Sequence, residues 1–312
     1  GRPLSTGEFG VGNFFLPDGA KRQRIATELI DRHVETFGFK ILKVRDLPVD
    51  SSRISDQASN LQMPIRQWIF AQDSMVGPRE FEEKIYRMLL DIERVAYLTP
   101  ELDGLYPLSL SSRLQVLKGR LNSSELIPYF RDLQDANHRI HTLYFHTRFS
   151  TNTDPHPTMA QPFRLMAHNG ELNTDKKNRL SEAAISRAQN KSIIRPKGQS
   201  DSCRLDQTLS ARVHEEGMDL VDAVVSMMPP AWENKNDLNA SVKSMLEYFS
   251  LFEEKNDGPA ALIFGDGSVV GARLDRLGLR PLRTVETKDY LAVMSEAGQI
   301  SFEPEAVSYT HL

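Results

Sequence analysis

Residues 142–174 read TLYFHTRFSTNTDPHPTMAQPFRLMAHNGELNT and contain two short strand patterns. In the first, side chains alternate between two faces over residues 143–148, which is the period of a half-buried strand ending at Arg148. The second, residues 164–168, is a short apolar run that stops at Asn169-Gly170, a dipeptide with a strong turn preference. The sequence therefore predicts that Arg148 and the Asn169-Gly170 pair lie at strand ends.

Groups at strand ends are often binding groups, because the sheet fixes them and the neighbouring loop leaves them reachable. The Arg148 guanidinium offers a planar fork of donors to a carboxylate. Asn169 and Gly170 can offer a side-chain amide N–H and a backbone N–H to a developing oxyanion. That combination suits a small amino acid attacked at a carbonyl. The alternative is a surface ion pair and a hairpin turn, and the pattern alone favours it because Asn-Gly is a common hairpin signal.

Composition excludes several classes of protein. The chain has 312 residues, 40% of them hydrophobic, and a net charge of −4 from 38 basic and 42 acidic residues. It has no basic stripe, so neither nucleic acid nor an anionic membrane is expected as a partner. Its one cysteine, Cys203, excludes an internal disulfide framework and a multi-cysteine metal site, and fits a reducing cytoplasm. No apolar run approaches the roughly 18 residues of a membrane span.

Strand patterns and helical patterns come in separate blocks along the chain. Apolar spacing predicts helices over 18–37, 78–96, 175–189, 201–216, 220–227 and 238–252. Alternation and short apolar runs predict strands over 10–17, 39–44, 66–71, 105–110, 114–118, 259–264, 269–273 and 291–295. Asp18 is the expected cap of the first helix, and residues 46–64 are expected to form a loop. Blocks of this kind favour an α+β fold over strict βαβ alternation.

Seven segments carry a resemblance to a known family. They read HTRFSTNT at 146–153, AHNGELNT at 167–174, GQSDS at 198–202, MMPPAW at 227–232, DGPAA at 257–261, LDRLGLRP at 274–281 and SE at 295–296. In wording and order they resemble the glutaminase domain of glutamate synthases, which are class II glutamine amidotransferases of the N-terminal-nucleophile hydrolase fold. The resemblance covers nearly the whole chain. It implies a four-layer αββα sandwich, incomplete at its N-terminus, with a partial domain over 1–305 and a tail foreign to the family over 306–312.

The resemblance also implies the roles of four residues. Arg148 would bind the α-carboxylate of glutamine, Asp201 would receive its α-ammonium, and Asn169 and Gly170 would form the oxyanion hole. Asp201 taken alone is interpreted as a helix N-cap, because Ser-Asp-Ser before a helical run is ordinary capping chemistry. Arg280-Pro281 is interpreted as a structural turn.

One departure from the family concerns the nucleophile. The family uses the thiol of the first residue of the mature chain, activated by that residue's own α-amine. Residue 1 is glycine, and the backbone amine of Cys203 is part of a peptide bond. Cys203 is therefore interpreted as a small, partly buried apolar side chain. We expect this stretch to be a fragment that lacks the catalytic cysteine and is inactive alone.

The parent protein implied by the resemblance hydrolyses L-glutamine to glutamate and ammonia. The ammonia would pass to downstream synthase domains of the same polypeptide, where 2-oxoglutarate is aminated and reduced with FMN and an iron–sulfur cluster. No cofactor or metal site is expected in this chain. NADPH, NADH and ferredoxin stay open as electron donors, with a small reductase subunit or ferredoxin as partner, in the cytoplasm or a plant plastid stroma.

Two other functions also stay open. One is a non-catalytic amidotransferase-like domain that binds an amino acid without turning it over. The other is the glutaminase domain of a different class II amidotransferase, for example one that serves a sugar or nucleotide precursor.

Overall fold

The structure is a computed structural model whose chain divides into two compact units. The first unit holds residues 1–164 and 186–199, and the second holds residues 165–185 and 200–312. The structure describes residues 4–5, 7–72, 76–147, 156–172, 180, 183–184, 186–188, 200–251, 256, 258–301 and 308–311.

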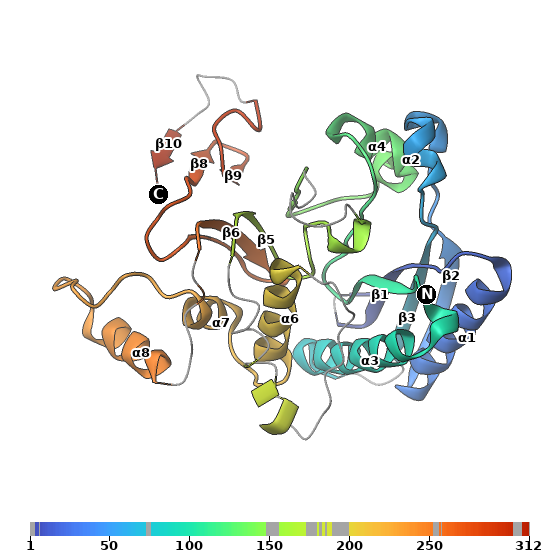
Figure 1. Ribbon diagram of the computed structural model, residues 1–312, viewed down its shortest axis with the longest axis horizontal. Helices are drawn as coiled ribbons and strands as arrows, with labels where there is room; N and C mark the ends of the chain where they lie inside the picture. Colours follow the sequence, from blue (N-terminus) through green and yellow to red (C-terminus); the bar gives the residue numbers. More distant parts are fainter. Residues whose placement is uncertain are drawn as a thin grey trace. The chain divides into compact units, whose positions relative to one another are not determined.

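The first unit is built on one four-stranded antiparallel sheet with the strand order β2-β3-β1-β4 (Figure 1). Its strands are β1 (Phe9–Phe15), β2 (Phe39–Asp46), β3 (Ile65–Gln72) and β4 (Tyr106–Ser111). Its helices are α1 (Ala20–Thr36), α2 (Asp56–Asn60), α3 (Pro78–Leu98) and α4 (Leu126–Tyr129).

Helices α1 and α3 pack against each other and cover one face of this sheet. The apolar stripe of α3 is fully buried there, as its helical spacing requires. Trp68, Phe14 and Phe70 supply the aromatic part of the same core from the strands, and the Phe14 and Trp68 rings meet edge to face. The opposite face is covered by residues 114–133, whose apolar side chains gather around Phe15 and Phe130.

A row of polar side chains crosses this second face, with one residue on each strand. Arg45 on β2 is opposite Gln67 on β3, Gln67 is opposite Asn13 on β1, and Asn13 is opposite Ser109 on β4. Arg45 donates to Gln67 and Gln67 donates to Asn13, both over 2.9 Å. Asn13 donates to the Val116 carbonyl, and the Val116 N–H donates to Ser109. The first two steps of the row are direct hydrogen bonds and the third runs through the Val116 backbone, so each member has a partner, as burial of polar groups requires.

The second unit contains two three-stranded antiparallel sheets with the orders β5-β6-β7 and β10-β8-β9. The strands are β5 (Met166–Gly170), β6 (Ala260–Gly265), β7 (Val270–Leu274), β8 (Arg283–Glu286), β9 (Leu291–Met294) and β10 (Ser308–His311). The helices are α6 (Asp201–His214), α7 (Leu220–Met227) and α8 (Ala240–Ser250), of which α6 packs on β5.

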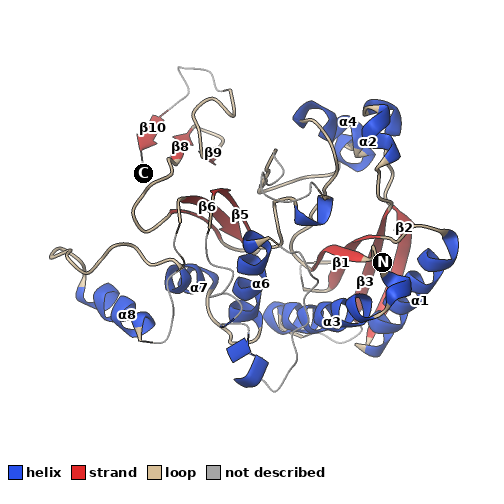
Figure 2. Cartoon of the chain, viewed as in Figure 1, coloured by secondary structure: helices blue, strands red, loops and turns tan. Residues whose placement is uncertain are grey.

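The expected α+β class is confirmed, since each unit combines antiparallel strands with helices (Figure 2). Helices were correctly expected at α1, α3, α6, α7 and α8, and strands at β1 to β4, β6, β7 and β9. The helix expected over 175–189 lies mostly outside the described residues. The face-to-face packing of two sheets in a four-layer sandwich stays a prediction.

Four local expectations were wrong. The described residues 142–147 form no strand, and Leu143 is 64% exposed, because no strand of the first unit pairs with them. Residues 114–118 are not a strand either, since the backbone of Val116 bonds to side chains instead of a neighbouring strand. Helix α1 is preceded by Gly19, without a side-chain cap from Asp18. The loop expected over 46–64 contains α2, which Ser55 caps.

None of the helices in the described part of the chain combines the length and the apolar character needed to cross a membrane.

The polar row predicts that replacing Asn13 destabilises the protein more than replacing an exposed asparagine. We expect Asn13→Ala to lower the free energy of unfolding by about 2–3 kcal/mol. The change leaves the buried Val116 carbonyl without its Asn13 donor and removes the nearer of two acceptors of the Gln67 amide, the other being Gln115 at 3.4 Å. Urea denaturation measures this change. Asn137→Ala is the matched control, since Asn137 is exposed and its amide bonds locally to Asp135, so its effect should stay within about 0.5 kcal/mol. Equal effects of the two variants would contradict a structural role for the row.

Candidate functional site

Asn169 and Gly170 are the last two residues of β5. Asn169 is opposite Ala261 and Gly170 is opposite Ala260 in the antiparallel pairing of β5 with β6. The expected strand is therefore present but displaced, covering Met166–Gly170 instead of residues 164–168. The Asn-Gly hairpin turn, which the pattern alone favoured, is wrong because a strand distant in sequence pairs with both residues.

Only glycine fits at position 170. The backbone has φ 131°, and a Cβ built on Gly170 would lie 1.8 Å from the Pro259 carbonyl oxygen. The same carbonyl accepts the Glu171 N–H at 3.0 Å. A side chain here would clash with backbone that is already committed to the sheet.

The Gly170 N–H points away from β6. Ala260, the residue opposite, uses its own N–H and C=O toward Asp275: its N–H donates to the Asp275 carboxylate, and its carbonyl accepts the Asp275 N–H at 2.7 Å. Gly170 and Ala260 therefore form the kind of antiparallel pair whose backbone groups point outward from the partner strand. Among the described residues, β5 is at the edge of the order β5-β6-β7, so the Gly170 N–H lies on the side of β5 where no described strand pairs with it.

The Asn169 side chain is held at both ends of its amide. Arg280 Nη2 donates to Asn169 Oδ1 at 2.6 Å, and Asn169 Nδ2 donates to Ser295 Oγ at 3.0 Å. Arg280 follows β7 and Ser295 follows β9. Three segments of the second unit thus meet at one side-chain amide.

Asp275, at the end of β7, fixes the turn that carries Arg280. Its carboxylate is 7% exposed and accepts four backbone N–H groups over 3.0–3.2 Å, from Ala260, Leu277, Leu279 and Arg280. Burial by itself would raise the pKa of the Asp275 carboxyl, but these donors together hold that pKa below its ordinary value. The carboxylate is therefore charged wherever the protein is folded near neutral pH.

Asp201 is the first residue of α6, and it does not cap this helix. Ser200 is the N-cap, and its Oγ accepts the Cys203 N–H at 3.2 Å. The N-cap interpretation of Asp201 was therefore wrong, and the Asp201 carboxylate lies outside the cap. An acidic side chain at this first position also suits the positive end of the helix dipole.

Two contacts attach the start of α6 to β5. His168 Nε2 is hydrogen-bonded to Ser202 Oγ. One turn further along the helix, the buried Asp206 carboxylate accepts the N–H groups of Leu165 at 2.8 Å and Met166 at 3.1 Å. His168 is adjacent to Asn169 in sequence, and Ser202 is adjacent to Asp201, so the first contact brings the two candidate site segments together.

The structure thus unites three of the four predicted site residues, Asn169, Gly170 and Asp201, in the second unit. The fourth, Arg148, lies outside the described residues. Cys203 lies in the first turn of α6 and is buried, more fully than the partial burial expected of it.

Three residues that support the site were missed by sequence reasoning. Asp275 was given no role, Arg280 was assigned to a structural turn, and Ser295 was noted only for its resemblance to the family. Arg280 and Asn169 are 111 residues apart, and no local pattern connects them. The segment LDRLGLRP contained the only signal, since an aspartate followed by several turn-forming N–H groups is a common way to fix a loop.

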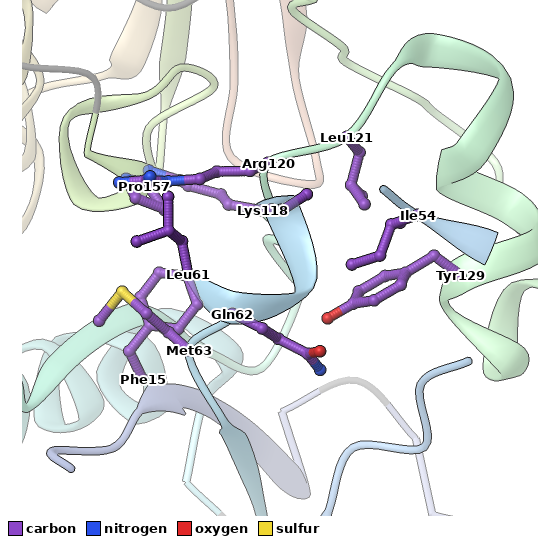
Figure 3. Close-up of a pocket in the computed structure, with 12 residues that line it drawn as sticks. Phe15, Ile54, Leu61, Gln62, Met63, Lys118, Arg120, Leu121, Tyr129 and Pro157 are labelled. Carbon is purple, nitrogen blue, oxygen red and sulfur yellow. The ribbon is translucent and has the colours of Figure 1, made fainter. Parts of the chain in front are cut away.

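A pocket in the first unit holds none of the predicted site residues (Figure 3). Its empty space, together with the adjoining open solvent, is about 290 Å³, and its walls combine apolar side chains such as Ile54 and Leu61 with polar ones such as Gln62, Lys118 and Arg120. Burial raises the pKa of Tyr129 to about 12, so this hydroxyl stays neutral. Within the described residues, no group of three His, Cys, Asp or Glu side chains is arranged to hold a metal ion.

Comparison with known families identifies the chain. The family model of class-II glutamine amidotransferases matches residues 2–311. The chain belongs to the class-II glutamine amidotransferases. Three curated relatives are glutamate synthases: the ferredoxin-dependent chloroplastic enzyme of Oryza sativa, 33% identical over 98% of this chain, ferredoxin-dependent glutamate synthase 2 of Synechocystis, 32% over 96%, and the NADH enzyme of Schizosaccharomyces pombe, 32% over 97%.

The amidotransferase chain spans about a fifth or less of the length of these relatives, between 15% and 20%. Among solved structures, glutamine phosphoribosylpyrophosphate amidotransferase from B. subtilis matches 97% of the chain, and the chain covers 44% of it, with 13% sequence identity and a TM-score of 0.26.

The four N–H groups bound by the Asp275 carboxylate predict that Asp275→Asn destabilises the protein by an amount that depends on pH. We expect Asp275→Asn to lower the free energy of unfolding by about 3 kcal/mol, because an amide accepts fewer of the four N–H groups and carries no charge. Since the folded pKa of Asp275 is depressed, the cost should be constant between pH 7 and pH 5. It should shrink only as the pH falls below the ordinary carboxyl value and the native carboxylate takes up a proton.

Urea denaturation at several pH values measures this cost. Asp289→Asn is the control, since Asp289 is exposed in the turn between β8 and β9. A cost for Asp275→Asn that already declines between pH 7 and pH 5 would contradict the depressed pKa.

Proposed function

We propose that this chain is the glutaminase domain of a glutamate synthase, which hydrolyses L-glutamine to glutamate and ammonia. The observation that supports it best is the junction of β5 and α6. There, the His168 to Ser202 hydrogen bond joins the start of α6, which carries Asp201, to the end of β5, which carries the Asn169 amide and the outward Gly170 N–H. Those are the groups needed for an α-ammonium and for an oxyanion.

The proposed chemistry assigns one task to each group. The Asp201 carboxylate binds the α-ammonium by a charge-assisted hydrogen bond. The nucleophile that the family resemblance assigns is the thiol of the first residue of the mature chain, which neither Gly1 nor Cys203 supplies. Its attack on the side-chain amide carbonyl turns the carbonyl oxygen into an oxyanion, which the Asn169 Nδ2 and the Gly170 N–H stabilise until the C–N bond breaks and ammonia leaves. Because both donors are fixed before the charge develops, they need no reorganisation in the transition state. Arg148, which the family resemblance assigns to the α-carboxylate, would complete the substrate's fixation.

For the whole protein, we propose that the ammonia released here aminates 2-oxoglutarate in the synthesis of glutamate. The glutamate synthase relatives support this. The chain is 32–33% identical to both ferredoxin-dependent and NADH-dependent enzymes, so sequence identity does not choose between these electron donors. The test is to supply the full-length natural protein with glutamine, 2-oxoglutarate and each reduced donor in turn. Two glutamates formed per glutamine consumed would support the proposal, and glutamine binding without turnover would contradict it.

Asn169→Ala tests the oxyanion role. In the full-length natural protein we expect the glutaminase kcat to fall about 10²- to 10³-fold, with little change in KM, because the donor acts on charge that exists only in the transition state. Ammonia release from glutamine measures both constants. Asn137→Ala, a change of the same side chain at an exposed position, is the control. An unchanged kcat in Asn169→Ala would overturn the oxyanion assignment.

Asp201→Asn tests the substrate-binding role. We expect KM for glutamine to rise roughly 10- to 100-fold, which corresponds to the loss of one charged hydrogen bond, while kcat changes less. Asp237→Asn removes a charge from an exposed residue of the same unit and serves as the control. A fall in kcat without any rise in KM would assign Asp201 to chemistry instead of binding.

A further inference from the structure

The two contacts of the Asn169 amide are not equivalent. Arg280 meets the oxygen end at 2.6 Å, and Ser295 meets the nitrogen end at 3.0 Å. A serine hydroxyl can donate or accept, so Ser295 would tolerate either orientation of the amide. An arginine guanidinium has only donors. Arg280 is therefore the neighbour that decides which end of Asn169 faces which way.

The orientation of this amide decides whether Asn169 can stabilise an oxyanion. With Oδ1 turned to Arg280, Nδ2 lies on the other side, where one of its two N–H groups bonds to Ser295 and the second is left for a ligand. The reversed amide would place its NH₂ group against the guanidinium and its oxygen toward the ligand. An oxygen there would repel an oxyanion instead of stabilising it.

Arg280 is itself fixed relative to the other oxyanion donor. Its backbone N–H and the N–H of Ala260 both donate to Oδ2 of Asp275, at 3.2 Å and 3.1 Å. Ala260 is the residue opposite Gly170 in the sheet. Asp275 Oδ2 therefore links two backbone positions: Ala260, which is opposite Gly170, and Arg280, whose side chain holds Asn169.

We propose that Arg280 is the positioning residue of the oxyanion hole: it locks the Asn169 amide with Nδ2 toward the substrate. The positively charged Arg280 guanidinium beside Oδ1 also polarises the Asn169 amide, which makes its Nδ2–H a stronger donor. This inference rests on the proposed glutaminase function, because it specifies how one of that function's donors is oriented. Arg280 acts through Asn169 and does not itself touch the substrate.

The test uses Arg280→Gln and Arg280→Lys in the full-length natural protein, with ammonia release from glutamine as the readout. A glutamine can accept as well as donate, so it permits the reversed amide, and we expect kcat to fall 10- to 100-fold with KM within threefold of wild type. A lysine ammonium has only donors, like the guanidinium. We therefore expect Arg280→Lys to recover most of the lost kcat, which a purely structural role would not explain.

The decisive measurement repeats Arg280→Gln in an Asn169→Ala background. If Arg280 acts through Asn169, the second substitution has nothing left to orient and kcat should change less than twofold. An additional 10-fold fall in that background would overturn the inference, and so would a loss confined to KM or a failure of lysine to recover activity. Arg276→Gln is the matched control, because Arg276 belongs to the same turn but pairs with Glu233, and its kcat should match wild type.

Three further outcomes separate this inference from the function on which it rests. If the wild-type protein has no glutaminase activity, the proposed function fails and the inference fails with it. If Asn169→Ala alone leaves kcat unchanged, the oxyanion assignment fails, and the inference that rests on it fails too. If Asn169→Ala lowers kcat but Arg280→Gln does not, only the positioning inference fails. Should Arg280→Gln not fold, as judged by thermal unfolding, Arg280→Met provides the second arm, because it keeps a long unbranched side chain and removes the donors to Asn169 Oδ1. It should lower kcat at least twofold in the wild-type background and leave it unchanged in the Asn169→Ala background.

Discussion

A buried carboxylate organises the backbone on which the proposed oxyanion donors depend. Asp275 gathers N–H groups from the start of β6 and from the turn after β7, and a buried charge without such partners would cost several kcal/mol. If the start of β6 and the turn after β7 separated, the buried Asp275 carboxylate would lose some of its N–H donors, which is unfavourable. Because Ala260 sets the position of Gly170 and Arg280 sets that of Asn169, the two donors share one frame of reference.

The two donors are fixed by different means. Gly170 offers a backbone N–H, whose direction follows from the alternation of the antiparallel ladder and from a close approach to Pro259 that excludes every side chain. Asn169 offers a side-chain N–H, whose direction depends on neighbouring side chains. A sheet thus determines one donor completely, whereas the other needs additional contacts at both ends of its amide. Donors arranged before the substrate arrives are the main source of electrostatic catalysis in sites of this kind.

Sequence reasoning succeeded where local periodicity controls the structure and failed where distant partners do. The stripe through Phe81, Ile85 and Met88 predicted α3 correctly, since helical spacing alone decides which face is buried. The Asn169-Gly170 pair was favoured as a turn, yet pairing with β6 makes it the end of a strand. Val116 likewise lies in a strand-like sequence whose backbone groups are taken by the side chains of Asn13 and Ser109. The contact between Arg280 and Asn169 has no local signature at all.

The polar row of the first unit has a consequence for how this family can diverge. Arg45, Gln67, Asn13 and Ser109 lie opposite one another across four strands. Arg45, Gln67 and Asn13 bond directly in that order, and Asn13 and Ser109 are connected through the backbone of Val116. An apolar replacement of Gln67 or Asn13 alone would remove a hydrogen-bond partner from groups on both sides, whereas an apolar replacement of neighbouring members together can be nearly neutral. Evolution at these four positions should therefore be concerted: sequences would either keep the row or lose adjacent members jointly, and the positions should covary although they are far apart in the chain.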